Sequence, residues 1–267
     1  MKAVLGLIAG NEGLPILLSR GIRKEGYRLV AVAHIGETRK DLRRYVDTLK
    51  WVEIGQLDEI IKYFRVERVR DVLMAGGISK THFFSRLKPD ARALKVLSRL
   101  TGRKDDALLR AIAAEIESEG MRVISPGIFL RDHLAPEGCW SERQPSEREK
   151  RDIAFGWELA KQLGALDIGQ SVVVKDQIVL AVEAIEGTDA AIRRGGKLGR
   201  GDVAVIKICK PTQDQRLDLP VIGPATVRVL AKAGGSLLAV EAGKTLVMEK
   251  ESVVLEADRN RICLVGM

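Results

Sequence analysis

The chain has 267 residues, enough for one large domain or two modest ones. Its composition, 46% hydrophobic and 30% charged, is that of an ordinary globular protein, and it contains no run of the roughly 20 apolar residues that a membrane-spanning helix needs. Aromatic residues make up only 4%, which disfavours stacking platforms for single-stranded nucleic acid, and the net charge of +8 favours an anionic ligand. The cysteines at positions 139, 209 and 263 form no disulfide framework, so we expect a cytoplasmic protein.

The first half of the chain alternates predicted strands with predicted helices. Apolar runs predict strands at 3–9, 29–33, 69–74 and 121–124, and helical periodicity predicts helices at 15–25, 57–66 and 105–119. Strands that alternate with helices at this spacing form βαβ units around a parallel sheet. We therefore expect a Rossmann-like α/β domain over residues 1–131.

The composition changes after residue 131. Residues 132–145 lack an apolar period and are expected to be a linker. Ser146 and Glu149 form a capping-box pattern that opens a helix to about residue 163. Further strands are predicted at 168–175, 178–184, 203–208, 237–240, 244–248 and 261–265, with helices near 224–233 and 249–259. Residues 146–267 are therefore predicted to form a mixed α+β domain.

Two glycine-rich turns follow predicted strands of the first half. Gly10, Asn11 and Gly13 follow the first strand, while Ala75, Gly76 and Gly77 end the strand at 69–74. Backbone N–H groups at such junctions can bind phosphate, and in an open parallel sheet ligands bind beyond the carboxyl ends of the strands. Both turns and His34 should therefore meet at one edge, although tight turns need small residues for purely structural reasons too. The spacing is not that of a dinucleotide fingerprint, and we see no acid placed for a ribose at the end of the second strand.

Charged residues also gather in the second half. The turn Glu183–Asp189 could hold Mg²⁺ or a ribose through its acids, or it could simply be a solvated turn that caps a helix at Thr188 or Asp189. The following segment, 193–200, is expected to be a flexible cationic loop that grips phosphate, although a solvated loop would have the same composition.

The loop after the strand at 203–208 combines carboxylates with cations. Asp214 and Asp218 stand among Lys207, Lys210 and Arg216, and prolines restrict the backbone. Carboxylates suit a hard metal such as Mg²⁺, and Lys and Arg suit phosphate. This loop is a candidate site for metal-assisted chemistry on a phosphorylated substrate, unless its charges only pair with one another.

Together these segments resemble a known family. The segments that carry the resemblance are 7–15, 72–77, 105–109, 134–138, 166–170, 181–189, 210–214, 218–224 and 239–243, and the most specific are E-x-I-E-G-T-D at 183–189 and K-P-x-Q-D-x-R-x-D-L-P at 210–220. Over essentially its whole length the chain is similar to the LpxI family of UDP-2,3-diacylglucosamine pyrophosphatases. The resemblance implies two domains with the active site in the cleft between them. It also implies Mg²⁺-dependent hydrolysis of that substrate to UMP and 2,3-diacylglucosamine 1-phosphate (lipid X) in lipid A biosynthesis, with water attacking the phosphorus nearer the sugar.

The residue pattern and the family resemblance together lead us to expect the following site residues. In the family an Asp of the 210–220 segment is catalytic, which corresponds to Asp214 or Asp218, and we favour Asp214. Lys210 and Arg216 are expected to stabilise charge on the phosphoryl oxygens, and the metal ligands are expected among Asp214, Asp218 and Glu186. The expected substrate-binding residues are Gly10, Asn11, Gly13, Ala75, Gly76, Gly77, Glu186, Gly187, Thr188 and Asp189.

Expectations about partners follow from the same reading. A two-chain lipid substrate and a basic first domain are compatible with peripheral contact with the inner membrane surface, and a homodimer would be ordinary for the family. No nucleic-acid signature is present. A non-catalytic module that binds a nucleotide sugar or a phospholipid stays open as an alternative, because binding alone would account for the glycine turns and the charge.

Overall fold

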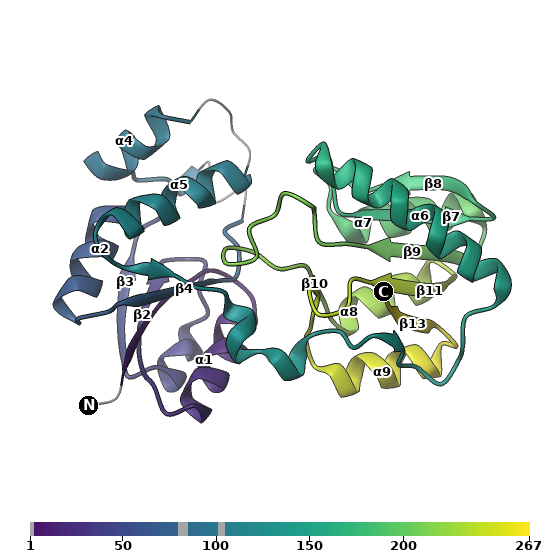
Figure 1. Cartoon of the computed structure of the whole chain (residues 1–267), viewed down its shortest axis with the longest axis horizontal. Helices are drawn as coiled ribbons and strands as arrows, with labels where there is room; N and C mark the ends of the chain where they lie inside the picture. Colours follow the sequence, from purple (N-terminus) through teal and green to yellow (C-terminus); the bar gives the residue numbers. More distant parts are fainter. Residues whose placement is uncertain (1–2, 80–84, 101–104) are drawn as a thin grey trace. The chain divides into compact units, whose positions relative to one another are not determined.

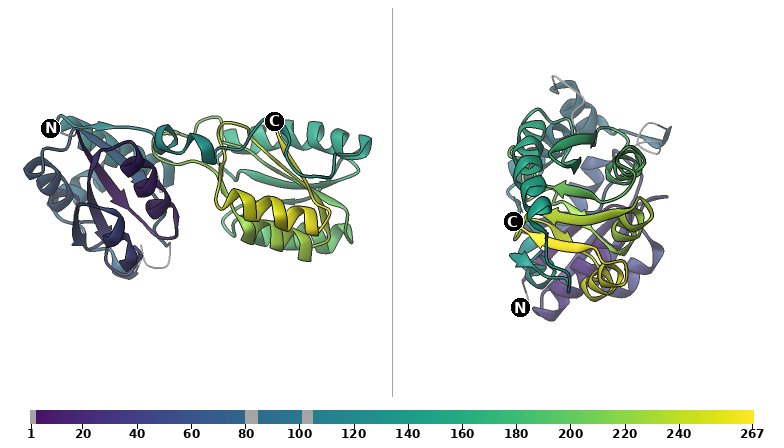
Figure 2. Two further views of the ribbon diagram at one scale, coloured as in Figure 1. Left: turned by 90° about the horizontal axis from the view of Figure 1, so that it is seen from below. Right: turned by 90° about the vertical axis from the view of Figure 1, so that its right-hand side faces the viewer.

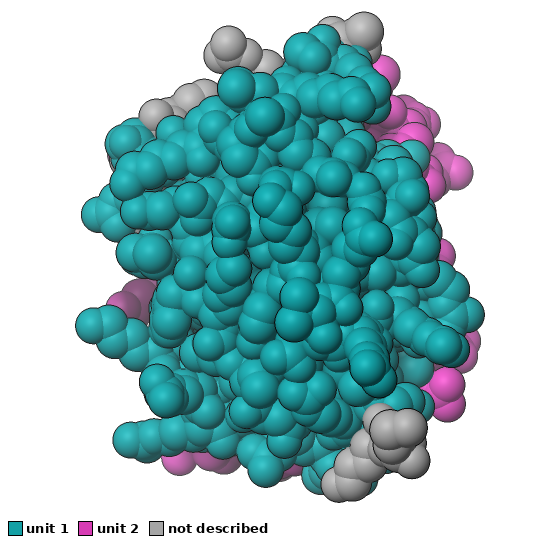
Figure 3. Space-filling view, turned by 90° about the vertical axis from the view of Figure 1, so that its left-hand side faces the viewer, with its two compact units in different colours: residues 1–130, 214–218 teal, residues 131–213, 219–267 magenta. Residues whose placement is uncertain are grey.

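The computed structural model describes residues 3–79, 85–100 and 105–267 (Figure 1). The chain divides into two compact units. Unit 1 comprises residues 1–130 and 214–218, and unit 2 comprises 131–213 and 219–267 (coloured separately in Figure 3). The segment 214–218 was expected to belong to the second domain, and it packs instead with the first.

Unit 1 is the Rossmann-like α/β fold that the sequence predicts. Its sheet has the order β3-β2-β1-β4-β5, and all its strands pair in parallel. The strands are β1 (Val4–Ala9), β2 (Arg28–His34), β3 (Thr48–Val52), β4 (Asp71–Ala75) and β5 (Arg122–Val123). The helices are α1 (Leu14–Lys24), α2 (Leu57–Val66), α4 (Ala91–Ser98) and α5 (Asp105–Ser118), with short 3-10 turns at Lys40–Tyr45 and Pro126–Phe129.

Side chains on alternate strand positions divide the core of unit 1 between the faces of its sheet. Ile8, Val30 and Val72 point to the face covered by α2, α4 and α5, where they form one apolar cluster with residues of those helices. Strand β3 and helix α4 were not predicted. In β3 only Val52 is buried, and Lys50 pairs with Glu59, so the strand lacks the continuous apolar run of its neighbours.

Unit 2 contains a mixed sheet with the order β6-β13-β11-β9-β7-β8 and a short parallel pair, β10 with β12. Its strands are β6 (Gly138–Cys139), β7 (Ser171–Lys175), β8 (Ile178–Val182), β9 (Val203–Lys207), β10 (Val221–Ile222), β11 (Gly235–Val240), β12 (Leu246–Val247) and β13 (Cys263–Gly266). Its helices are α6 (Glu147–Ala165), α7 (Thr188–Gly199), α8 (Pro224–Lys232) and α9 (Lys250–Arg259), and a 3-10 turn lies at Arg131–His133.

Helices cover both faces of the mixed sheet. Val172, Ala204 and Ile206 pack against α6, whereas Val173, Val205 and Leu238 pack against α7, α8 and α9 (Figure 2). Strands β9, β11 and β13 run parallel and β7 runs antiparallel to β9. The end of β9 and the beginning of β7 therefore lie at the same edge, where Lys207 is paired with Ser171.

Three local expectations in unit 2 have clear outcomes. The capping box of Ser146 and Glu149 is confirmed at the start of α6. The hairpin at Asp176 and Gln177 is also confirmed, with both residues at positive φ (51° and 58°) despite the missing glycine. The flexible loop expected at 193–200 is wrong: residues 188–199 form helix α7, since its glycines pack closely on Val173 and Ala233.

Residues 132–145, expected as a linker, lie inside unit 2 and include β6, which pairs with β13. Arg143 from this stretch donates to both carboxylate oxygens of the buried Glu149. Of the helices that the structure describes, none is both long and apolar enough to cross a bilayer.

Candidate functional site

The glycine turns of unit 1 meet where the strand order reverses, between β1 and β4. Gly10 N–H donates to the carbonyl of Ala75 and Asn11 N–H to that of Gly77, both at 2.8 Å. A Cβ atom on Gly10 would collide with the Gly77 carbonyl, and Gly76 has a φ of +78°, so glycine is required at both positions. The expected convergence of the turns is confirmed, and ligands of open parallel sheets bind at such a switch point.

Glu37 was not predicted as a site residue from the sequence. Its carboxylate accepts hydrogen bonds from both turn segments. Its Oε2 accepts from the Asn11 side chain at 3.2 Å and from Ser79 N–H at 2.8 Å, while Asn11 Oδ1 accepts from Gly77 N–H at 3.1 Å. An acid soon after the end of β2 is the signal that could have identified it, because that position faces the same edge of the sheet. The edge therefore carries a carboxylate beside the glycine turns.

His34 closes β2 at this edge, as expected. Its Nδ1 lies 3.0 Å from the carbonyl oxygen of Ala9, so Nδ1 carries the proton and donates. Burial lowers the pKa of His34 below 6.5, although the Ala9 hydrogen bond and the charge of Glu37 oppose the shift. The imidazole is therefore neutral at pH 7 and presents Nε2 as an acceptor.

The loop segment 214–218 is anchored in unit 1. Leu217 is 6% exposed and belongs to the apolar cluster that also contains Val72 and Val123. Ser125 Oγ donates to the carbonyl of Gln215 at 2.9 Å. The anchor therefore fixes the backbone on both sides of Arg216.

Asp214 is paired with Arg216 in this segment. Arg216 Nη2 lies 2.7 Å from Asp214 Oδ2, and Arg216 N–H donates to Asp214 Oδ1 at 3.0 Å. Hydrogen bonds from Arg216 hold the pKa of Asp214 below 3.8, although partial burial opposes the shift. The backbone N–H of Asp218 donates to the Asp214 carbonyl at 3.2 Å, which closes the turn between the two carboxylates. The sequence alternative in which these charges pair with one another therefore holds for Asp214 and Arg216.

Lys210 lies in unit 2 and has a different partner. Its Nζ is 2.6 Å from Asp167 Oδ1, and its backbone N–H donates to the side chain of Gln213. The buried carboxylate of Glu241 holds the residue before Lys210 in place. It accepts from Cys209 N–H at 2.9 Å and from Lys161 Nζ at 2.6 Å. The Lys210 ammonium carries three donors, so it could donate to a phosphoryl oxygen in addition to Asp167.

In the acidic turn before α7, Glu183 is buried and Glu186 is exposed. Gly187, at a φ of +83°, is the N-cap residue, and Thr188 is the first residue of the helix rather than its cap. Glu186 is exposed and pairs with Arg194, and Asp189 faces Arg193 at 3.9 Å. Glu186, which we had expected to bind metal or substrate, is thus engaged locally on the surface of unit 2.

A buried polar cluster lies beneath the first turn of α7. Lys207 Nζ donates to Thr188 Oγ1 at 3.1 Å, and Thr188 Oγ1 donates to Glu183 Oε1 at 2.9 Å. Ser171 Oγ lies 3.4 Å from the same hydroxyl. The sequence places Glu183 and Lys207 among other charged residues, and nothing in the sequence indicated that these two would be buried.

The donor chemistry fits Mg²⁺ only in part. Within residues 3–79, 85–100 and 105–267, no group of three or more His, Cys, Asp and Glu side chains is arranged to hold a metal. Asp214 and Asp218 nevertheless offer hard carboxylate oxygens from one turn, and Mg²⁺ is commonly held by one or two carboxylates together with substrate phosphates and water. These two residues are therefore suitable ligands once a phosphate is present.

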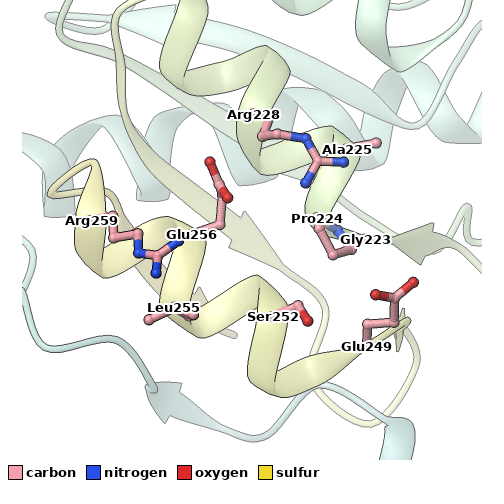
Figure 4. Close-up of a pocket in the computed structure, with 9 residues that line it drawn as sticks. All are labelled: Gly223, Pro224, Ala225, Arg228, Glu249, Ser252, Leu255, Glu256 and Arg259. Carbon is pink, nitrogen blue, oxygen red and sulfur yellow. The ribbon is translucent and has the colours of Figure 1, made fainter.

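A shallow pocket of about 390 Å³ lies between α8 and α9 (Figure 4). It is lined by Gly223, Pro224, Ala225, Arg228, Glu249, Ser252, Leu255, Glu256 and Arg259. The sequence-predicted site residues are absent from this lining, which carries charges of both signs.

Two solved structures that resemble this chain do so only weakly. A multifunctional pyruvate carboxylase from Rhizobium etli is 13% identical, with a TM-score of 0.30 over 65% of this chain and 14% of that chain. A biotin carboxylase from Campylobacter jejuni is 14% identical, with a TM-score of 0.27 over 73% of this chain and 42% of that chain. Likeness at this level supports no inference about the site.

Sequence comparison is far more specific. The model of the LpxI N-terminal domain matches residues 4–133, and the model of the LpxI C-terminal domain matches residues 136–265. A curated protein of Caulobacter vibrioides, named UDP-2,3-diacylglucosamine pyrophosphatase LpxI, is 38% identical over 98% of this chain and 97% of its own length. The chain therefore belongs to the LpxI family.

Proposed function

We propose that this protein is a hydrolase that cleaves the pyrophosphate of UDP-2,3-diacylglucosamine, a step of lipid A biosynthesis, and releases UMP and 2,3-diacylglucosamine 1-phosphate. The observation that carries the proposal is the 38% identity to the curated Caulobacter enzyme across nearly both whole chains. The glycine turns of unit 1 and the Asp214–Arg216 pair supply groups suited to a nucleoside diphosphate.

The chemistry assigned to the chain is direct hydrolysis. Water attacks the phosphorus nearer the sugar, and the bond from that phosphorus to the bridging oxygen breaks. The bridging oxygen leaves with UMP, and the oxygen of water stays on the sugar phosphate. Asp214, held ionised by Arg216, accepts a proton from the attacking water.

The charge of the pyrophosphate must be balanced as this bond breaks. Arg216 and Lys210 are the cations assigned to the phosphoryl oxygens. Arg216 would give up part of its present pairing with Asp214, and Lys210 would donate to them in addition to Asp167. Mg²⁺, held by Asp214 and Asp218, would neutralise phosphate charge when bound. The N–H groups of Gly13 and Gly76 would hold the uridine diphosphate, because those of Gly10, Asn11 and Gly77 already donate within unit 1.

The test is hydrolysis of UDP-2,3-diacylglucosamine by the purified full-length chain, with UMP release followed by chromatography. We expect turnover with Mg²⁺, loss of turnover with EDTA, and loss of at least 100-fold in kcat for Asp214→Asn. Asp176→Asn is the matched control, because Asp176 lies in an exposed hairpin at a positive φ that Asn tolerates.

Each result bears on a separate part of the proposal. A wild-type protein that retains the nucleotide lipid without releasing UMP would support the non-catalytic binding module instead. Full activity of Asp214→Asn would reject the assigned proton acceptor, and full activity in EDTA would reject the metal.

A further inference from the structure

Two cysteines that lie far apart in the sequence are neighbours in unit 2. The sulfur atoms of Cys139 and Cys263 are 3.7 Å apart, although 124 positions separate the two residues along the chain. Cys139 ends β6, which pairs antiparallel with β13 so that Cys139 lies opposite Val265. Residues two positions apart on a strand share a face, so Cys263 and Cys139 point to the same side of the sheet. There they join the apolar cluster that packs against α6.

The two thiols differ in exposure. Cys263 is fully buried, whereas Cys139 is half-buried on the outermost strand of the sheet. Burial raises the pKa of the Cys263 thiol to about 12, and the neighbouring Cys139 adds to the shift. Cys263 is therefore protonated at pH 7, and Cys139 is the sulfur that a small solute reaches first.

Arg143 places a positive charge beside the pair. This charge acts to lower the pKa of Cys263, against the larger effect of burial, and the carbonyl oxygen of Arg143 accepts from Cys139 Sγ at 3.3 Å. The guanidinium is held by two hydrogen bonds to Glu149 and by one of 2.8 Å to the carbonyl of Arg261, just before β13. A nearby cation favours the thiolate, which is the form of cysteine that attacks an oxidant.

We propose that Cys139 and Cys263 form an oxidation site, at which hydrogen peroxide converts the two thiols into a reversible intramolecular disulfide. The Cys139 thiolate attacks one peroxide oxygen and the O–O bond breaks. That oxygen stays on the sulfur as a sulfenic acid, and the other leaves as water. The sulfur of Cys263 then attacks the sulfur of Cys139, the S–O bond breaks, and a second water leaves with the Cys263 proton.

The balance of this step is complete. The two thiols lose two electrons and two protons, and the peroxide is reduced to two molecules of water. None of the residues assigned to the hydrolysis takes part. A dithiol reductant reverses the change by thiol–disulfide exchange, so in a reducing compartment the pair returns to the thiol form.

The position of β6 allows the bond to close and gives it a physical effect. The sulfur atoms must approach from 3.7 Å to about 2 Å. Strand β6 has two residues and lies at the end of the sheet, beside β13, so a small shift disturbs few ladder hydrogen bonds. The disulfide would join the first strand of unit 2 to its last and restrict the unfolded chain over a long loop, which stabilises the folded state.

The test is peroxide oxidation of the reduced, purified full-length chain at low protein concentration. The remaining thiols are then alkylated in denaturant and assigned by peptide mass spectrometry. We expect one alkylated cysteine, Cys209, and a linked pair of peptides that contain Cys139 and Cys263. The melting temperature should rise by about 5 °C or more, and dithiothreitol should restore the reduced value and all three thiols.

Single variants test the order of attack. In Cys263→Ser the sulfenic acid of Cys139 has no second thiol to react with, so we expect dimedone to trap it. In Cys139→Ser the buried Cys263 should react with peroxide at least about tenfold more slowly than Cys139 does in the wild type. Cys209→Ser is the matched control, because it removes the third, buried cysteine, and it should form the same cross-link as the wild type.

Three other results would overturn the oxidation site. They are three alkylated cysteines after peroxide treatment, a sulfinic acid at Cys139 without a cross-link, and a disulfide between two molecules. A cross-link that forms only in protein unfolded by circular dichroism would overturn it as well. If a serine variant does not fold, the peptide map of the wild type decides alone.

Discussion

The guanidinium of Arg216 donates to both carboxylate oxygens of Asp214, with Nε 3.1 Å from Oδ1 and Nη2 2.7 Å from Oδ2. Its remaining nitrogen, Nη1, lies 2.9 Å from Glu117 Oε1 on α5. Arg216 therefore orients the candidate proton acceptor and also ties its loop to a helix of unit 1. A planar guanidinium can serve both partners at once, which an ammonium group cannot do with the same geometry.

We predict that Arg216→Met lowers kcat roughly 100-fold, because it removes a donor to the reacting phosphate and the group that orients Asp214. Arg216→Lys should recover only a small part of the loss. Steady-state hydrolysis measures both, and Arg148→Met, on the surface of α6, serves as the control. A lysine variant with wild-type kcat would show that charge alone is sufficient at this position.

Leu217 should matter for both stability and turnover. Leu217→Ala removes a buried side chain from the apolar cluster of unit 1, and we expect a loss of about 2–4 kcal/mol in the free energy of unfolding. The kcat should fall as well, since the same anchor positions Asp214. Urea denaturation and kinetics are the measurements, with the exposed Leu198→Ala as control. An unchanged unfolding midpoint would contradict the packing described above.

Glu37 should govern nucleotide affinity rather than the chemical step. Glu37→Ala removes the acceptor shared by Asn11 and Ser79, so the two glycine turns lose their common tie. We expect the KM and the inhibition constant of UMP to rise about tenfold, with kcat within threefold of wild type. Glu25→Ala, on the exposed end of α1, is the comparison. A selective fall in kcat would instead place Glu37 in the chemistry.

Glu149 should make the stability of unit 2 depend on pH in the acid range. Burial raises the pKa of Glu149, but hydrogen bonds from Arg143, Ser236 and Ser146 outweigh it and hold the pKa at about 2. Because the folded pKa lies below the usual 4.5, the stabilisation is complete above about pH 4.5 and is lost as the pH falls toward 2. It amounts to about 3 kcal/mol.

This pH dependence can be measured by urea unfolding between pH 2.5 and 6. Glu149→Gln should flatten the dependence below pH 4.5 and lower stability at pH 6. Glu147→Gln, at an exposed position of the same helix, should leave both unchanged. Identical slopes for wild type and Glu149→Gln would contradict the assigned hydrogen-bond network.

Much of unit 1 could be predicted because its signals are local. Buried parallel strands such as Val4–Ala9 are continuous apolar runs, and α2 places Leu57, Ile60 and Phe64 on one face. The meeting of Gly10 with Gly76 follows from parallel pairing alone. Strand β3 lacked such a run, since its burial depends on neighbours that are distant in sequence.

The candidate site was only partly predictable for the same reason. The sequence identified Asp214 and Arg216 by their spacing, but the pairing of Lys210 with Asp167 depends on tertiary structure. Glu183 and Glu186 are equivalent in the sequence of one turn, and only the fold buries the first and exposes the second. The later part of α7, within residues 193–200, is predicted as a loop because its glycines disfavour a helix, and close packing on Val173 overrides that preference.

The placement of Leu217 has a consequence for how the protein is made. During synthesis on the ribosome, the N-terminal half emerges first, yet its apolar cluster includes a side chain that emerges only after most of the later half. The apolar cluster of unit 1 therefore cannot be completed until Leu217 has left the ribosome. Its final packing is thus delayed until most of the polypeptide has been translated.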